Sequence, residues 1–198
     1  MIKKNNRNLL VLLVAVRLFD LFSTYVAGGG ELGGETNFLV ADFNLGWSAL
    51  IISNAVFVII FLLLLIRQSD KNYYLAEKNI NPKSGFTSYF GVLYYGKELT
   101  LVEFLSSFKI NYNIFFNSLI HVITLTVIVC SIIIGLSNIA SGFNYANLFS
   151  ISNKWYQDNI ITALNMIVFI IVVILYHYRR YNNFKIKTEK LCIPIQKA

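Results

Sequence analysis

The first long apolar stretch of the chain carries an arginine and an aspartate one helical turn apart, Arg17 and Asp20. Ionisable side chains are costly inside a bilayer, so residues of this kind are candidates for a functional site. Arg17, Asp20 and Thr24 follow the i, i+3, i+7 spacing that places side chains on one face of a helix. That face presents a carboxylate that can accept a cation or a proton, with a counter-charge beside it.

Three further apolar stretches carry polar side chains near the same depth. Two of them repeat the i, i+4, i+7 spacing, and another places an asparagine beside a face of small residues. At about 1.5 Å of rise per residue, one polar group from each stretch falls near one level of an apolar core about 30 Å thick. We therefore predict one intramembrane polar cluster, which consists of Arg17, Asp20, Thr24, Asn54, Asn117, His121, Thr124 and Asn165.

The loop after the first stretch, residues 28–44, is rich in glycine and carboxylates. We expect Glu35 and Asn37 to form an outer lip above the Asp20 face. Asp20, Glu35 and His121 together could supply carboxylate and imidazole ligands to a metal. The chain contains neither His-Glu-x-x-His nor Cys-x-x-Cys, so the sequence leaves the metal and any cofactor unknown.

The composition is that of a membrane protein. Hydrophobic residues make up 56% of the chain and charged residues 14%, against about 45–50% and about 25% in soluble domains. Four segments reach the length of about 20 apolar residues that a membrane span needs. These are residues 9–27, 45–66, 114–136 and 159–178. We predict one all-α membrane domain over residues 1–198, a four-helix bundle, whose first span is retained and not cleaved as a signal peptide.

The positive charges follow the positive-inside pattern of membrane proteins. Lysine and arginine gather before the first span, in the segment 67–112 and in the tail 179–198, whereas the other two loops contain only Lys154. This predicts a multi-pass protein of the cell (inner) membrane with both termini in the cytoplasm. The expected partner of these charges is anionic lipid at the cytoplasmic face. Nucleic acid is not expected, because the basic residues flank spans and form no separate basic domain.

The segment between spans two and three is predicted to be helical and to lie at the membrane interface. It contains a turn signal at residues 81–85, then an aromatic run at 86–95, then an amphipathic stretch at 99–108. Thr100 and Glu103 have the spacing of a capping box at the start of that stretch. The tail 179–198 is short and basic, and we expect little order beyond Arg180.

Part of the chain resembles a family of small uncharacterised prokaryotic multi-span membrane proteins. The resemblance rests on three consecutive features, namely Asp20-Leu21-Phe22-Ser23-Thr24, a glycine-containing loop and Glu35-Thr36-Asn37. Members carry Asp-x-x-Ser-Thr in one helix and Glu-x-Asn-Pro at the start of the next. The resemblance covers about residues 17–61, and Phe38 stands where that family has proline. It implies that Asp20, Thr24, Glu35 and Asn37 act as one unit, and it implies no particular activity.

Three classes of function fit these features. In the first, a polar pocket around Asp20 binds or passes a small cation, a proton or a polar lipid group, as in transport. In the second, the protein is a structural or assembly subunit whose polar residues lock its helices or bind a membrane partner, including a second copy. In the third, it is an intramembrane enzyme in which His121 and a carboxylate share acid–base work.

The free-energy cost of placing Arg17 and Asp20 inside a bilayer favours the first class, a pocket that binds or passes a ligand. An interhelical hydrogen bond in a membrane contributes about 0.6 kcal/mol on average. A charged side chain at mid-bilayer costs at least about 2.5 kcal/mol, so locking helices alone is a poor reason to retain Arg17 and Asp20. The enzyme class is the least favoured, because no nucleophile or metal motif is complete in the sequence.

Overall fold

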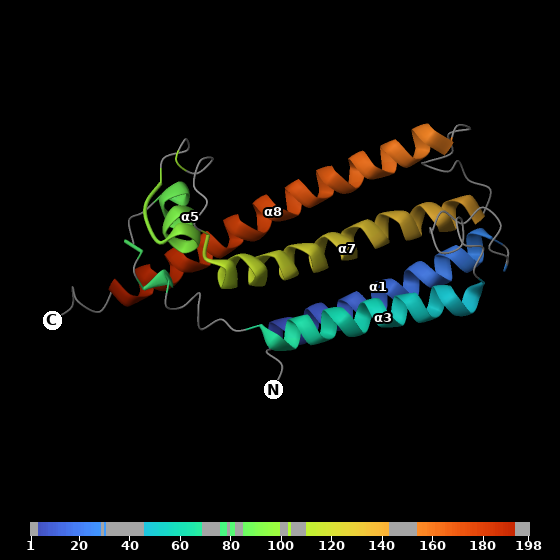
Figure 1. The fold of residues 1–198 in the computed structure, drawn as a ribbon, viewed down its shortest axis with the longest axis horizontal. Coiled ribbons are helices and arrows are strands. Elements are labelled where there is room, and N and C mark those ends of the chain that lie inside the picture. The colour runs from blue at the N-terminus through green and yellow to red at the C-terminus, as the bar shows by residue number, and fades with distance from the viewer. Residues whose placement is uncertain are drawn as a thin grey trace. The chain divides into compact units, whose positions relative to one another are not determined.

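The computed structural model describes residues 4–28, 30, 46–68, 76–78, 80–81, 85–99, 103, 110–142 and 154–192. These residues form five helices and no strand, which confirms the predicted all-α class. The helices are α1 (Lys4–Ala27), α3 (Trp47–Arg67), α5 (Phe86–Tyr95), α7 (Tyr112–Gly142) and α8 (Lys154–Cys192) (Figure 1).

Four of the helices are long and apolar enough to cross a membrane. The qualifying segments are Asn6–Ala27, Trp47–Arg67, Tyr112–Ala140 and Ile160–Glu189. Each overlaps one predicted span, so the expectation of four helices long and apolar enough to span a membrane is confirmed. Large apolar side chains such as Leu18, Ile52 and Leu175 are exposed on these helices, as expected for surfaces that face lipid.

The end of the chain differs from the sequence prediction. We expected little order beyond Arg180, but α8 continues to Cys192. Tyr181 and Phe184 lie one turn apart on this extension, and both are buried against Tyr89 of α5. The expectation was wrong for residues 181–192, because the apolar contacts that stabilise this helical extension come from a distant part of the chain.

The chain divides into two compact units. The first consists of Met1–Arg67 and Ile123–Ile170, and the second of Gln68–Val122 and Ile171–Ala198. The first unit therefore contains α1, α3, the later turns of α7 and the earlier turns of α8. The second contains α5, the first turns of α7 and the later turns of α8.

In the first unit, α1 and α3 run side by side in opposite directions (Figure 1). Near one end, Asn6 Nδ2 donates a 2.9 Å hydrogen bond to the carbonyl oxygen of Leu65. Near the other, the rings of Tyr25 and Trp47 lie 5.8 Å apart. Between these contacts a buried core joins the two helices to α7, and its members are Leu13, Val16, Phe61 and Ile128. We call these four residues the apolar layer.

In the second unit, α5 packs against the later turns of α8 (Figure 1). Its core contains Ile80, Tyr89, Leu93, Tyr94, Ile114, Tyr181 and Phe184. Gly96 ends α5 in the left-handed conformation, with φ of 75°, and donates its N–H to the carbonyl of Val92. A helix does lie between spans two and three, as predicted. Most of the stretch 99–108 lies outside the described residues.

Candidate functional site

Arg17 and Asp20 form an ion pair within α1. Arg17 Nη1 lies 2.8 Å from Asp20 Oδ2, and each side chain is 20% exposed. The same Nη1 donates a 3.1 Å hydrogen bond to Ser131 Oγ on α7. The Arg17 guanidinium also lies over the ring of Phe57 on α3, 5.5 Å from its centroid, a cation–π distance. One arginine of α1 therefore contacts both α3 and α7 in the first unit.

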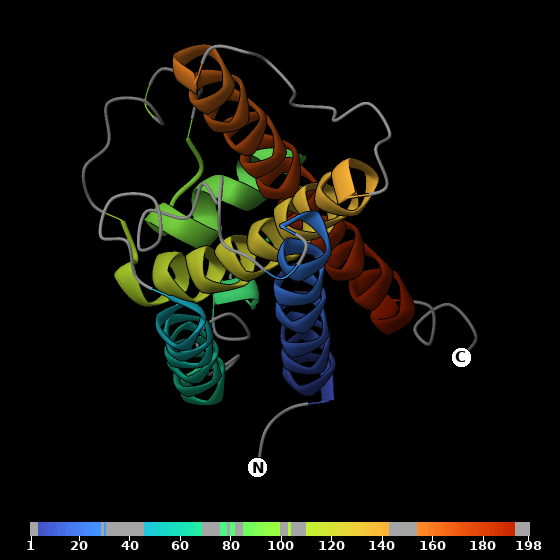
Figure 2. The same ribbon diagram turned by 90° about the vertical axis from the view of Figure 1, so that its right-hand side faces the viewer.

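A second polar contact between α1 and α7 lies nearly two turns further along α1. Ser23 Oγ donates a 2.8 Å hydrogen bond to the backbone oxygen of Asp20. It also accepts a 3.4 Å hydrogen bond from Asn138 Nδ2. Figure 2 shows the ends of α1 and α7 beside each other in this region. Polar groups on α1 and α7 thus satisfy one another over two helical turns.

Gly135 allows the two helices to approach closely between these polar contacts. A Cβ atom at this position would lie 2.4 Å from Cε1 of Phe19, a distance that real Cβ contacts do not show. Small residues commonly occupy such positions in membrane helices because they let the backbones come together. The ring of Phe19 fills the space that a side chain at position 135 would need.

The sequence analysis missed the α7 partners of Arg17 and Ser23, although a signal for them exists. Ser131, Gly135 and Asn138 have the spacing i, i+4, i+7, which places them on one helix face. This is the same criterion that selected Asn117, His121 and Thr124 on the earlier turns of that helix. Spacing identifies polar faces, but it does not say which face of a long helix meets Arg17.

Asn54 of α3 brings a further polar group to the first unit. Its side chain is only 5% exposed, and its Nδ2 donates a 2.8 Å hydrogen bond to the carbonyl of Leu50 in its own helix. Within the described part of the chain, Asn54 Oδ1 and Arg17 Nε are buried and have no hydrogen-bond partner. Buried polar atoms are nearly always paired, so these two atoms call for an explanation. We name the polar layer as Arg17, Asp20, Ser23, Asn54, Ser131 and Asn138.

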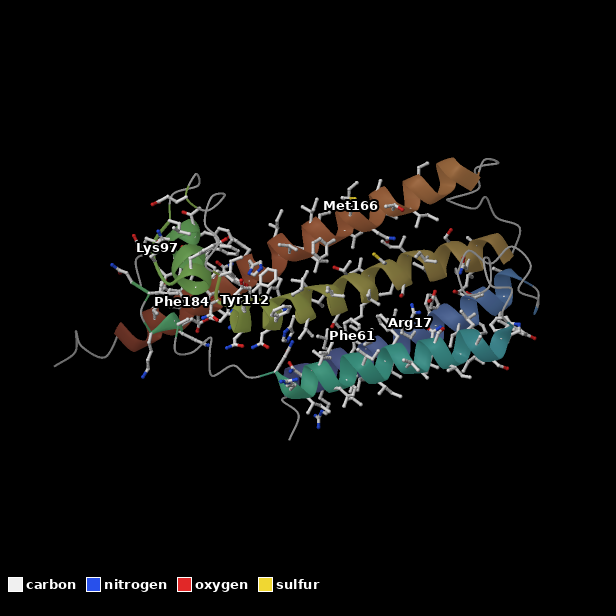
Figure 3. The ribbon with its side chains drawn as sticks, in the orientation of Figure 1. Arg17, Phe61, Lys97, Tyr112, Met166 and Phe184 are labelled. Atoms are coloured by element: carbon white, nitrogen blue, oxygen red, sulfur yellow. The ribbon has the colours of Figure 1, made fainter. Side chains whose placement is uncertain are left out.

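The apolar layer borders the polar layer on the side of the α1 N-terminus. Leu13 and Val16 precede Arg17 on α1, and Ile128 precedes Ser131 by three residues on α7. Figure 3 shows Phe61 of α3 nearer to the beginning of α1 than Arg17 is. The polar groups therefore extend from Arg17 toward the C-terminal end of α1, while packed hydrocarbon lies on their other side.

The remaining predicted members of the cluster have varied surroundings. In the first unit, Thr124 is fully buried, whereas Thr24 and Asn165 are half-buried. In the second unit, His121 Nδ1–H donates a 3.0 Å hydrogen bond to the backbone oxygen of Asn117. The imidazole of His121 also stacks on the ring of Tyr176, 5.8 Å between centroids. That His121 and Asn117 join the Asp20 site stays a prediction.

The predicted outer lip, Glu35 and Asn37, lies outside the described residues. Across the part of the chain that is described, no three His, Cys, Asp or Glu side chains come together as a metal site. Asp20, the carboxylate on which the metal hypothesis rests, is ion-paired with Arg17. A group that binds here must therefore interact with an arginine as well as a carboxylate.

No family model, curated protein or solved structure matches this chain. The resemblance to small prokaryotic membrane proteins over residues 17–61 therefore stays a prediction. The function must be inferred from the side chains of the polar layer themselves.

The second unit contains two polar networks among its aromatic residues. The hydroxyls of Tyr94 and Ser118 are hydrogen-bonded, and Tyr94 Oη lies 3.5 Å from His177 Nδ1. Separately, Tyr89 Oη donates a 3.2 Å hydrogen bond to Glu77.

Glu77 also pairs with Arg180 at 3.8 Å. Burial, and then the charge of Glu77, raises the pKa of the Tyr89 phenol above its ordinary value of 10.0. The first network links Tyr94 of α5 to His177 of α8. The second links Tyr89 of α5, through Glu77, to Arg180 of α8. Both networks therefore join α5 to α8.

Proposed function

We propose that the polar layer is an intramembrane binding site for a small polar group, in the first place a lipid headgroup. The observation that carries this proposal is the Arg17–Asp20 pair at 2.8 Å inside an apolar helix, together with the buried and unpartnered Nε of the same arginine. The pair has no net charge, but it offers hydrogen-bond donors and acceptors side by side. Such a site suits a group that has both a donor and an acceptor.

Binding is better supported than passage across the membrane. A cation that entered the site would have to compete with Arg17 for the Asp20 carboxylate. Further movement toward the N-terminal end of α1 would bring it into the apolar layer, where a charge has no polar partner. Transport of a cation or a proton, which the sequence also allowed, receives less support from this arrangement than occupation of the site from one side.

In the proposed topology, this site extends from about the middle of the bilayer toward its outer surface. The distribution of lysine and arginine favours cytoplasmic termini, so the C-terminal end of α1 faces outward. Arg17 lies ten residues before Ala27, where α1 ends, which is about 15 Å along the helix axis. In the same topology, the basic residues of the second unit meet the anionic lipids of the cytoplasmic leaflet of the cell membrane.

The near-isosteric variant Asp20→Asn tests the proposal. The wild type and the variant are purified into nanodiscs of phosphatidylcholine, with and without added phosphatidylglycerol, and their unfolding temperatures are compared. A lipid-dependent stabilisation of the wild type that the folded variant lacks supports a binding site. If both proteins gain the same stabilisation, the lipid acts elsewhere and the proposal is wrong.

The α1–α7 contacts favour a second candidate, a structural or assembly subunit of a membrane complex. Arg17 bonds Ser131, Asn138 bonds Ser23, and Gly135 accommodates Phe19. Each of these contacts holds two helices together without any ligand. In this case Asp20→Asn lowers the unfolding temperature by the same amount in every lipid, or it dissociates a complex that native mass spectrometry detects for the wild type.

A further inference from the structure

We propose that Arg17 Nε and Asn54 Oδ1 bind one and the same ligand, a phosphate group that also carries a hydroxyl. This inference rests on the proposed function and names the class of group that the polar layer takes. It assigns a role to Asn54 on α3, whose amide is almost fully buried.

The antiparallel register of α1 and α3 places Asn54 near the level of Asp20. Asn6 meets Leu65, Arg17 meets Phe57, and Tyr25 meets Trp47. Position 54 lies between the last two of these contacts on α3, as position 20 does on α1. Asn54 also shares the inward face of α3 with Leu50, Phe61 and Leu65, which are buried.

Asn54 is a neighbour, on the same helix, of the residue that contacts Arg17. Phe57, whose ring lies under the Arg17 guanidinium, is three residues after Asn54. Side chains three residues apart on a helix have Cβ atoms about 5–6 Å from each other. The proposed ligand contacts the guanidinium and the amide at the same time.

The chemistry of the two atoms defines what such a ligand must carry. Arg17 Nε bears a hydrogen and can only donate, whereas Asn54 Oδ1 can only accept. Asn54 Nδ2 is already engaged by the carbonyl of Leu50. The ligand must therefore accept a hydrogen bond from Nε and donate one to Oδ1, and Asp20 close by disfavours a bare anion without a donor.

A phosphate with a hydroxyl meets both requirements. Its anionic oxygen pairs well with a guanidinium, and its O–H group supplies the donor for Asn54. Phosphatidylglycerol, with a phosphate and two glycerol hydroxyls, and inorganic monohydrogen phosphate both have this chemistry. Phosphatidylcholine has the phosphate but no N–H or O–H donor, so it serves as the background lipid.

The test uses the full-length protein in phosphatidylcholine nanodiscs with three additions, namely none, phosphatidylglycerol in the bilayer, or inorganic phosphate in the buffer. The unfolding temperature is measured for the wild type, Asn54→Leu, Asp20→Asn and the control Asn6→Leu. Asn6 is a well-matched control, because it is equally buried on the same helix pair and its amide already donates to Leu65.

We expect one addition to raise the unfolding temperature of the wild type and of Asn6→Leu, and to leave Asn54→Leu unchanged. The effective addition identifies the source of the phosphate as lipid or solution. Without any addition, Asn54→Leu should unfold at a higher temperature than the wild type, because it removes an unpartnered buried oxygen. A higher unfolding temperature of Asn54→Leu shows that this variant is folded. Its failure to respond to the addition then reflects the loss of binding.

Several outcomes would overturn the inference. If Asp20→Asn loses the shift while Asn54→Leu retains it, the binding site stands but Asn54 takes no part in it. If all variants shift equally, or the wild type does not shift at all, both this inference and the proposed binding site are wrong. A lower unfolding temperature of Asn54→Leu with a retained shift would assign Asn54 a purely structural role.

Discussion

Arg17 on α1 donates one hydrogen bond from Nη1 to Ser131 on α7, at 3.1 Å, and another from the same atom to Asp20, at 2.8 Å. The residue that neutralises the carboxylate is thus also the residue that joins the two helices. Substitutions at Asp20 and at Ser131 can separate these two roles, because each removes only one of the two hydrogen bonds of Arg17.

Asp20→Asn should destabilise the protein by about 1–3 kcal/mol, because it leaves the Arg17 charge without its partner in apolar surroundings. The expected loss is below that of a fully buried pair, since both side chains are 20% exposed. The double variant Arg17→Met with Asp20→Leu removes both charges and should recover most of this loss. Reversible unfolding in mixed micelles measures all three free energies.

The prediction is tested by the coupling free energy between the substitutions at Arg17 and Asp20. A double-mutant cycle should show that the effects of the single substitutions are far from additive. Additive effects would mean that Arg17 and Asp20 act independently, and the ion pair would then contribute nothing to the stability of α1.

Ser131→Ala should cost about 1 kcal/mol, near the upper range for interhelical hydrogen bonds in membranes, because its donor is a charged guanidinium. Ser53→Ala is a suitable control, since Ser53 Oγ donates only to Leu50 of its own helix, at 2.9 Å. Unfolding free energies of the two variants give the comparison. Equal losses would show that the Arg17–Ser131 hydrogen bond does not stabilise the α1–α7 contact.

Gly135→Ala should destabilise the first unit by about 1–3 kcal/mol through overpacking. The added Cβ would lie 2.4 Å from Cε1 of Phe19, so the ring of Phe19 or one of the two helices has to move. Phe19→Leu in the same chain should restore part of the loss by making room. Gly46→Ala is the control, because a Cβ there meets nothing within 4 Å, and a loss as large as that of Gly135→Ala would contradict the packing argument.

The unfolding free energy should fall when the pH rises above about 10, in part through Tyr89. Burial raises the pKa of its phenol above 10.0, so the folded state holds this proton more tightly than the unfolded state. The contribution of Tyr89 is therefore constant below pH 10 and is lost as the pH rises further. Tyr89→Phe should show a shallower alkaline loss in urea titrations.

Tyr112→Phe is the control for the alkaline experiment, since Tyr112 is 65% exposed and should lose stability as the wild type does. The same alkaline slope for the wild type and Tyr89→Phe would show that this buried phenol does not contribute to the pH dependence.

Labelling of Cys192 tests the proposed orientation of the chain. Only two cysteines occur in the sequence, and Cys130 lies within a spanning helix, so Cys130→Ala leaves one thiol near the C-terminus. A membrane-impermeant maleimide should fail to react with intact cells and should react with inverted vesicles. Reaction in intact cells would place the C-terminus outside, and the polar layer would then extend from about the middle of the bilayer toward its inner surface.

Several features could be predicted from the sequence because they depend on neighbours along the chain. Continuous apolar stretches predicted four helices able to span a membrane, and the structure contains four helices of sufficient length and hydropathy. The spacing of Arg17 and Asp20 predicted that the two could pair within one helix, and they do. Both results follow from the rise and periodicity of an isolated helix, without knowledge of its partners.

The contacts between helices were decided by the tertiary structure. Arg17 bonds Ser131, a residue that the sequence analysis did not select, and Asn54 is buried with an unpartnered oxygen. The helical extension of α8 depends on Tyr89 of α5, which is about ninety residues earlier in the chain. Hydropathy and spacing describe the face of each helix, but the register and closeness of two helices arise from side chains that meet only in the folded protein.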